Sequence, residues 1–170
     1  MYTVSVPLVS QTLHRSDLTA LTQQLREAGV SRIFLSIGTY IADRDKRRTC
    51  MATLGEQCAF FKAEGFQVGI WLWTIQFPEE NNFTKITSVY GQVRNYEVCP
   101  ADPNFREFAA NYIKELAVLH PDVILFDDDY RLTVHNRDLA CACDLHLALT
   151  RKILGRPVTR EEIVDSFRGP

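Results

Sequence analysis

Three consecutive aspartates, Asp127, Asp128 and Asp129, are the residues of this chain whose type and spacing best suit catalysis. They directly follow residues 123–126 (VILF), an apolar run typical of a buried strand. Like charges this close raise the pKa of at least one carboxyl group, so an acid and a carboxylate coexist near neutral pH. In an extended strand the first and third side chains point to one side, about 6.5 Å apart. The cluster is therefore our candidate for general acid/base chemistry, the alternative being a helix cap with solvated neighbours.

A pair of tryptophans ends another strand-like run, residues 67–74 (QVGIWLWT). The two-residue period of a strand places Trp71 and Trp73 on one face. An aromatic face suits the apolar face of a sugar ring, so we predict that both bind substrate, Trp73 more directly because it lies nearer the strand tip. A buried aromatic core is the alternative. Further substrate-binding candidates follow other predicted strands or the aspartates: His14, Tyr40, Tyr130 and Arg131.

Cys141, Cys143 and His146 form a second pattern, in which Cys143 and His146 would share one face of a helix. A closed zinc site needs four ligands, and Cys99 is the obvious remaining candidate. Small thiols packed at a helix start are the commoner explanation. We therefore expect no metal site, and we expect no cofactor.

Alternating strands and helices must position these residues. Apolar and β-branched runs predict strands at 3–9, 32–37, 67–74 and 123–126. Helical spacing predicts helices at 17–28 and 50–64, with Gly29 and Gly65 as stops, and a third opened by Asp102 and Pro103. Residues 75–101 read as a loop, and residues 138–167 read as two helical pieces split at 155–157.

Strands that alternate with helices predict right-handed βαβ units and a parallel sheet, an α/β fold. Four such units make either the first four βα units of a TIM (β/α)8 barrel or an open flavodoxin-like sheet. Both folds gather their chemistry at the carboxyl ends of the strands. We expect residues 1–170 to form a single domain, an incomplete barrel in the first case.

Composition excludes several classes of protein. Of 170 residues, 19 are basic and 21 acidic, a net charge of −2 that does not suit a nucleic-acid binder. No apolar run approaches the roughly 18 residues of a membrane span, and the first residues lack the basic region of a signal peptide. Five cysteines, an odd number, fit a reducing compartment. We therefore expect a cytoplasmic protein that binds neither nucleic acid nor membranes.

Four segments together resemble bacterial glycoside hydrolase-like (β/α)8 barrel proteins. They are 98–103 (VCPADP), 123–132 (VILFDDDYRL), 141–146 (CACDLH) and 159–162 (TREE). In such barrels one catalytic carboxylate ends the fourth strand and its partner lies near the sixth or seventh. The resemblance implies that Asp127, Asp128 or Asp129 is the first of the pair, as acid/base or as nucleophile.

A complete barrel takes about 250 residues, so the resemblance implies that this chain is the N-terminal half, without the partner carboxylate. The expected ligand is a carbohydrate whose glycosidic bond the whole barrel hydrolyses. A half-barrel has two open sheet edges, so we expect the chain alone to self-associate and to show no glycosidase turnover.

Two other functions stay open. The first is a Mg²⁺-dependent phosphatase of the haloacid-dehalogenase kind, because an apolar strand ending in Asp-Xaa-Asp matches its first motif at Asp127 and Asp129. The second is a non-catalytic carbohydrate-binding or assembly module that keeps half a barrel.

Overall fold

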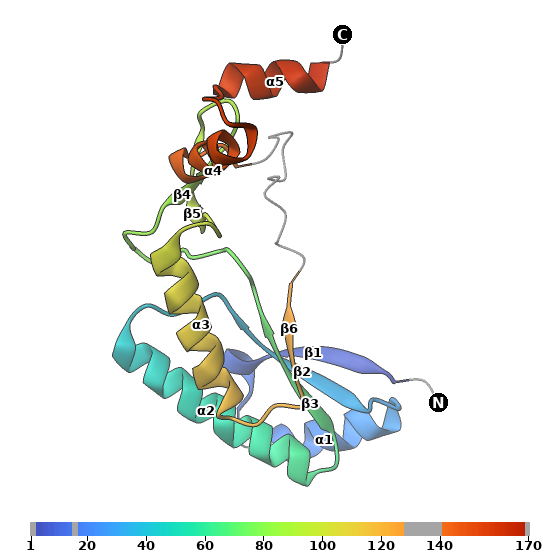
Figure 1. The fold of residues 1–170 in the computed structure, drawn as a ribbon. Helices are drawn as coiled ribbons and strands as arrows, with labels where there is room; N and C mark the ends of the chain where they lie inside the picture. Colours follow the sequence, from blue (N-terminus) through green and yellow to red (C-terminus); the bar gives the residue numbers. More distant parts are fainter. Residues whose placement is uncertain (1–2, 15–16, 128–140, 169–170) are drawn as a thin grey trace. The chain divides into compact units, whose positions relative to one another are not determined.

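The structure, a computed structural model, describes residues 3–14, 17–127 and 141–168. The chain divides into two compact units (Figure 1). Unit 1 consists of Met1–Trp73 and Ala110–Asp127, and unit 2 of Thr74–Ala109 and Asp128–Pro170. Helix α3, Pro103–Ala117, supplies residues to both units. The organisation of the chain as a single domain stays a prediction.

Unit 1 is built on a four-stranded sheet in the order β1-β2-β3-β6, in which every neighbouring pair is parallel. The strands are β1 Ser5–Val9, β2 Arg32–Gly38, β3 Gln67–Leu72 and β6 Val123–Phe126. This order confirms the predicted α/β class with consecutive parallel βα units. It also excludes the flavodoxin-like alternative, which would place the first strand between the second and the third.

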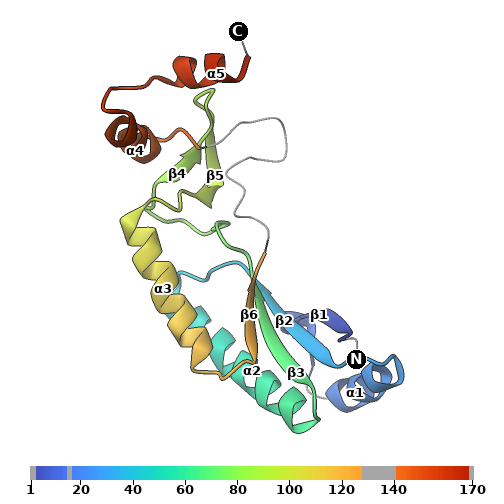
Figure 2. The same ribbon diagram turned by 45° about the vertical axis from the view of Figure 1, so that its right-hand side comes forward.

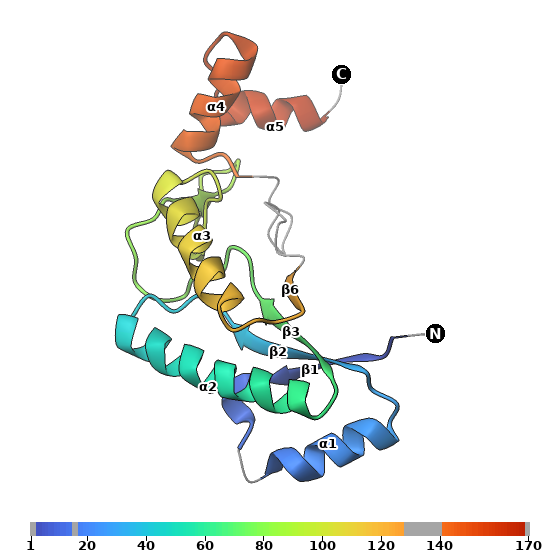
Figure 3. The same cartoon turned by 60° about the horizontal axis from the view of Figure 1, so that its bottom comes forward.

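One face of this sheet packs against helices. Figures 1 and 3 show α1 (Leu18–Glu27) and α2 (Arg44–Ala63) along it. Alternate residues of the central strands point to this face and are at most 3% exposed: Ile33, Leu35 and Ile37 on β2, and Val68, Ile70 and Leu72 on β3. The α2 side chains that meet them are equally buried: Leu54, Cys58 and Phe61. The core of unit 1 is therefore a layer between sheet and helices, formed by the two-residue period of the strands and the helical period of α2.

The opposite face of the sheet carries no helix of unit 1 among the described residues. Its side chains are less buried: Phe34, Ser36 and Trp71 are half-buried, Leu125 is 40% exposed and Val9 is 52% exposed. Trp71 and Leu125 are register partners on β3 and β6, so this face continues to the edge strand. It is the face that would point into a closed barrel.

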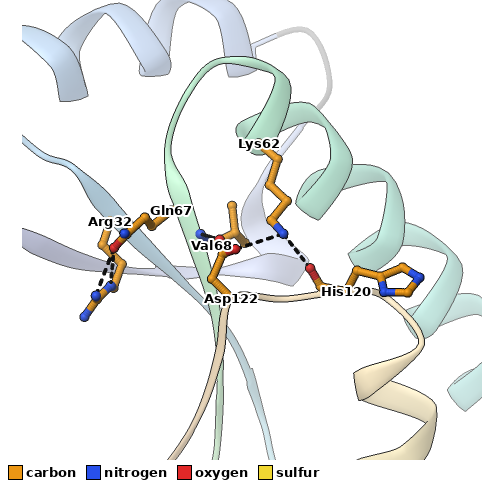
Figure 4. Close-up of polar contacts among 6 residues, drawn as sticks. All are labelled: Arg32, Lys62, Gln67, Val68, His120 and Asp122. Carbon is orange, nitrogen blue, oxygen red and sulfur yellow. Dashed lines mark hydrogen bonds and ion pairs between the residues drawn. The ribbon is translucent and has the colours of Figure 1, made fainter.

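The amino ends of β3 and β6 are tied together by charged groups (Figure 4). The Asp122 carboxylate accepts a hydrogen bond from the Val68 N–H at 2.7 Å and lies 3.0 Å from Lys62 Nζ. Lys62 also donates to the His120 carbonyl at 2.6 Å. His120 has a φ of 53°, the left-handed turn that leads from α3 towards β6. These contacts lie opposite the strand ends that carry the candidate site, and their role is structural.

Unit 2 contains an antiparallel hairpin and two helices (Figure 2). The hairpin pairs β4 (Lys85–Thr87) with β5 (Val93–Val98), and the helices are α4 (Asp144–Leu154) and α5 (Arg160–Arg168). The helices confirm the predicted pieces on either side of 155–157. The loop predicted at 75–101 is wrong over β4 and β5, which are strands. The sequence did not reveal them, because β4 has only three residues and the polar sequence of β5 (VRNYEV) shows little apolar alternation.

Helix α2 begins at Arg44, earlier than the predicted start at residue 50. Its first turns (RDKRR) are charged and show no apolar spacing. The Asp43 side chain nevertheless caps them by accepting from the Lys46 N–H at 2.8 Å. Among the residues that the structure describes, none of the helices combines the length and the apolar composition that a membrane span requires.

Candidate carbohydrate site and metal centre

Trp73 and Asp127 lie at the carboxyl ends of neighbouring parallel strands. Leu72 and Phe126 are register partners, and each is followed directly by one of these two residues. The Asp127 N–H donates to the Leu72 carbonyl at 3.1 Å, and the Trp73 N–H donates to the Gly38 carbonyl at 2.9 Å. Both side chains are half-buried. The backbone of both residues is therefore held at the carboxyl end of the sheet, and their joint role in a site stays a prediction.

Trp71 lies one pleat below Trp73, on the face without helices. It pairs in register with Ser36 on one side and Leu125 on the other. Its indole Nε1 is buried and has no hydrogen-bond acceptor among the described residues. Trp71 therefore lies within the paired part of β3, on the face without helices, whereas Trp73 follows the last residue of the strand.

The other predicted substrate-binding residues have different surroundings. His14 is exposed in the segment between β1 and α1. Tyr40 is 2% exposed and packs edge-on against Tyr112, with ring centroids 5.1 Å apart. A side chain so buried belongs to the core, so we leave Tyr40 out of the site proposed below. Asp128, Asp129, Tyr130 and Arg131 lie outside the described residues.

Unit 2 gathers Cys99, Cys141, Cys143 and His146 into one cluster. One ligand atom from each residue lies within 4.8 Å of all the others. Nδ1 of His146 is 3.3 Å from Sγ of Cys99 and 3.5 Å from Sγ of Cys143, and these two sulfur atoms are 3.5 Å apart. The three cysteines are at most 6% exposed and none is in a disulfide.

Backbone hydrogen bonds hold the segments that carry these ligands. Cys99 directly follows β5, and its N–H donates to the Thr84 carbonyl at 2.7 Å. On the other side, the Ala142 N–H donates to the Thr87 carbonyl at 2.7 Å. Cys143 is the N-cap residue of α4, so His146 falls in the first turn of that helix. The hairpin and the start of α4 thus bring together residues 44 positions apart in the chain.

The cluster favours one thiolate before any ion binds. The hydrogen bond between the thiols of Cys99 and Cys141 raises the pKa of Cys99 and lowers the pKa of Cys141. Burial raises the pKa of the Cys143 thiol. A buried sulfur that carries negative charge beside two more thiols and an imidazole is an environment that a cation stabilises.

The donor set and its spacing fit a tetrahedral Zn²⁺ ion. Zinc takes cysteine sulfur at about 2.3 Å and histidine nitrogen at about 2.0 Å, so ligand atoms around it are about 3.8 Å apart or slightly less. The distances among Cys99, Cys143 and His146 lie near that value, and the ligand atom of Cys141 lies within 4.8 Å of the other three. The sequence shows three of these residues in the spacing Cys-Xaa-Cys-Xaa-Xaa-His. The fold places Cys99, which is remote in sequence, next to them. The sequence interpretation of these residues as packed thiols without a metal ion stays a prediction, and the arrangement is also compatible with metal binding.

No protein-family model matches the chain, and no curated protein matches it by sequence. Among solved structures, the crystal structure of a β-galactosidase from the psychrophilic Marinomonas ef1 is similar, with a TM-score of 0.66 and 15% sequence identity. The match covers 91% of this chain and 25% of that one, so the chain spans about a quarter of the length of the β-galactosidase. At this identity the likeness concerns the fold alone. The chain thus shares part of the fold of this β-galactosidase.

Proposed function

We propose that this chain forms part of a glycoside hydrolase-like barrel that binds a carbohydrate, with Trp73 stacking on a sugar ring and Asp127 as a carboxylate of the reaction. The single observation that carries the proposal is the placement of these two residues at the carboxyl ends of adjacent strands β3 and β6. Active sites of parallel α/β barrels occupy that edge. The similar fold of a β-galactosidase makes β-galactosides the first ligands to test.

Catalysis by the full mechanism needs a second carboxylate, as acid/base or as nucleophile, placed across the glycosidic bond. We propose that this partner is not supplied by the described residues of unit 1. The isolated chain should then bind a galactoside without hydrolysing it. Asp128 and Asp129, which directly follow Asp127 in the sequence, lie outside the described residues and stay predicted catalytic residues.

Titration with methyl β-galactoside, followed by tryptophan fluorescence and calorimetry, tests the proposal. We expect Trp73→Ala to weaken binding at least tenfold and Asp127→Asn to weaken it less, because stacking supplies more contact area. Tyr96→Ala is the matched control, since Tyr96 is an aromatic residue of unit 2 that is 67% exposed. Equal affinity in Trp73→Ala and the parent chain would overturn the assignment. Mg²⁺-dependent release of phosphate from a phosphomonoester would favour the phosphatase alternative instead.

We also propose a second function, the binding of a structural Zn²⁺ ion by Cys99, Cys141, Cys143 and His146. The carrying observation is the convergence of four suitable ligand atoms within 4.8 Å of one another. Four protein ligands leave no open position, which is typical of structural rather than catalytic zinc. The ion would cross-link the β4–β5 hairpin to the start of α4.

Elemental analysis and cobalt substitution test the zinc site. We expect one zinc per chain, and an intense visible spectrum with thiolate-to-metal charge transfer when Co²⁺ replaces it. Cys143→Ser and His146→Ala should lose stoichiometric metal. Cys50→Ser is the matched control, because Cys50 lies on α2 in unit 1, outside the cluster. Equal metal loss in Cys50→Ser, or full loading of Cys143→Ser, would overturn the site.

A further inference from the structure

A basic stripe runs along the first turns of α2. Arg44, Arg47 and Arg48 are spaced i, i+3 and i+4, so their side chains share one face of the helix, and Met51 continues that face. Four of the first five residues of α2 (RDKRR) are basic, although the whole chain has a net charge of −2. Like charges three or four positions apart on a helix are destabilising. An anion bound at the stripe would offset this repulsion.

The stripe lines a pocket in unit 1. The pocket measures about 400 Å³ and lies between the first turns of α2 and the end of α3, where Glu115, Val118 and Leu119 complete its lining. All of these residues belong to unit 1. Pockets that bind small molecules measure about 300–1,000 Å³. The size therefore suits a small ligand.

One of the three arginines is held in place, and the other two are exposed. Nε of Arg47 is 3.1 Å from Oε2 of Glu115, and the Arg47 side chain is 20% exposed. Arg44 is exposed, and the Arg48 side chain is 81% exposed. The contact of Arg48 with Asp45, at 3.2 Å, is an exposed ion pair of the kind that contributes little stability. Arg44 and Arg48 can therefore turn to a ligand beside the fixed charge of Arg47.

The charge of the lining matches a dianion. Three arginines and one glutamate give the lining residues a net charge of +2. A phosphate monoester carries about 1.5 to 2 negative charges at pH 7, whereas a carboxylate carries one. The planar guanidinium group also matches the geometry of phosphate oxygens, to which it donates two parallel hydrogen bonds. The lining therefore favours a phosphate group over a single carboxylate.

The uncharged part of the lining suits an apolar group. Met51 and Leu119 are half-buried and Val118 is 71% exposed. These three side chains form what we call the apolar floor of the pocket. Removal of such side chains from water by the organic part of a ligand would add to the binding free energy. A ligand with both a phosphate and an apolar group fits this lining better than inorganic phosphate does.

We propose that this pocket binds a phosphomonoester. Arg44 and Arg48 hold the phosphate oxygens, Arg47 adds a fixed positive charge, and the organic group of the ligand lies on the apolar floor. The proposal concerns binding between α2 and α3 and includes no hydrolysis. It does not depend on the proposed sugar and zinc sites, nor on the phosphatase alternative, which concerns the aspartates after β6.

Calorimetric titration of the full chain with phenyl phosphate, without added Mg²⁺, tests the proposal. We expect Arg44→Gln and Arg48→Gln each to weaken binding about tenfold, as for the loss of a hydrogen bond between charged groups. Lys46→Gln is the matched control, because it removes the same charge from the same turn of α2. Lys46 is two positions from each arginine, so it faces elsewhere, and it lines a different hollow with Ser10 and Leu13. Equal weakening in all three variants would show a diffuse positive field and overturn the site.

A comparison of ligands tests the chemical class. Inorganic phosphate should bind more weakly than phenyl phosphate because it makes no contact with the apolar floor, and benzoate should bind more weakly because it carries one charge. Val118→Asn should weaken the binding of phenyl phosphate and leave that of inorganic phosphate unchanged. Since Val118 is 71% exposed, circular dichroism should show this variant folded. Benzoate that binds as tightly as phenyl phosphate, or phenyl phosphate that does not bind at millimolar concentration, would overturn the proposal.

Discussion

The ring of Phe34 lies so close to Gly69 that a β-carbon at position 69 would come within 2.5 Å of ring carbons Cδ1 and Cε1. The two residues are register partners on β2 and β3. From the other neighbouring strand, Cγ1 of Val123 would lie 2.9 Å from the same β-carbon. The side chains of two strands therefore fill the place that a side chain of β3 would take, and Phe34 covers β3 on the face without helices.

Gly69→Ala should therefore destabilise the chain. The added methyl group meets an aromatic ring and a β-branched side chain in a packed sheet, and overpacking of this kind costs about 1–3 kcal/mol. Urea unfolding followed by tryptophan fluorescence measures the loss, because both tryptophans belong to unit 1.

Gly55→Ala is the matched control for that change. Gly55 lies inside α2, and among the described residues the atom that a β-carbon there would meet is Cδ2 of Leu119, at 3.4 Å, an ordinary contact distance. Alanine in a helix interior is favoured over glycine by about 0.5–1 kcal/mol, so this variant should be as stable as the parent or more so. Phe34→Leu should relieve part of the loss in a Gly69→Ala background. Equal stability of Gly69→Ala and the parent would contradict the packing described here.

Asp122 should make the stability of unit 1 depend on acid pH. The Val68 N–H and then Lys62 hold the pKa of its carboxyl group below the usual value. A carboxyl group whose pKa is lower in the folded state stabilises that state above its unfolded pKa of about 3.9 and loses this contribution as the pH falls through the folded value.

Asp122→Asn should accordingly cost about 0.5–1 kcal/mol near neutral pH, a modest figure because the side chain is 42% exposed. The difference from the parent should shrink towards zero in acid. Asp45→Asn is the control, since the Asp45 side chain is 83% exposed on the first turn of α2. Urea midpoints measured across the acid range test the prediction, and a difference that does not change with pH would argue against it.

Among the described residues of unit 2, Asp102 is a carboxylate whose replacement should destabilise the fold. Burial by itself would raise the pKa of Asp102, but hydrogen bonds from the backbone N–H groups of Thr84, Phe105 and Asn104 outweigh it and lower the pKa. The residue caps α3 and at the same time holds the segment before β4. Asp102→Ala would leave three N–H groups without their acceptor.

We expect Asp102→Ala to cost about 1–3 kcal/mol, and Asp102→Asn less, because an amide oxygen still accepts hydrogen bonds. Thermal unfolding followed by far-ultraviolet circular dichroism measures both. The comparison with Asp144→Ala serves as the control, because Asp144 is 98% exposed at the start of α4. Similar losses for the two alanine variants would show that the buried cap has no special role.

Zinc should raise the stability of the chain if the cysteine cluster binds it. A ligand that binds only the folded state adds about 2.7 kcal/mol when its free concentration is a hundred times the dissociation constant. Addition of Zn²⁺ to metal-free protein should therefore raise the unfolding temperature, and a chelator should reverse the change. The His146→Ala variant should show neither effect. A zinc response that persists in that variant would place the ion elsewhere.

Local sequence patterns were enough to predict the sheet of unit 1. The runs RIFLSI and VILF are short, apolar and bounded by helices, so periodicity alone identifies them as parallel strands. Gly29 and Gly65 adopt left-handed backbone after α1 and α2, with φ of 72° and 88°, as expected of helix stops. The placement of Trp73 and Asp127 at one edge follows from the same logic, because residues directly after parallel strands share an edge.

Only the tertiary structure decided which side chains meet. From the sequence we predicted Tyr40 as a substrate-binding residue. In the structure Tyr40 packs against Tyr112, which is remote in sequence, and is buried. The sequence named Cys99 as the possible fourth ligand of Cys141, Cys143 and His146, but it could not show that these residues meet, because Cys99 follows a hairpin that apolar periodicity does not reveal. Spacing along a chain sets local conformation through neighbours a few residues away, whereas a four-ligand cluster depends on long-range contacts that no local pattern encodes.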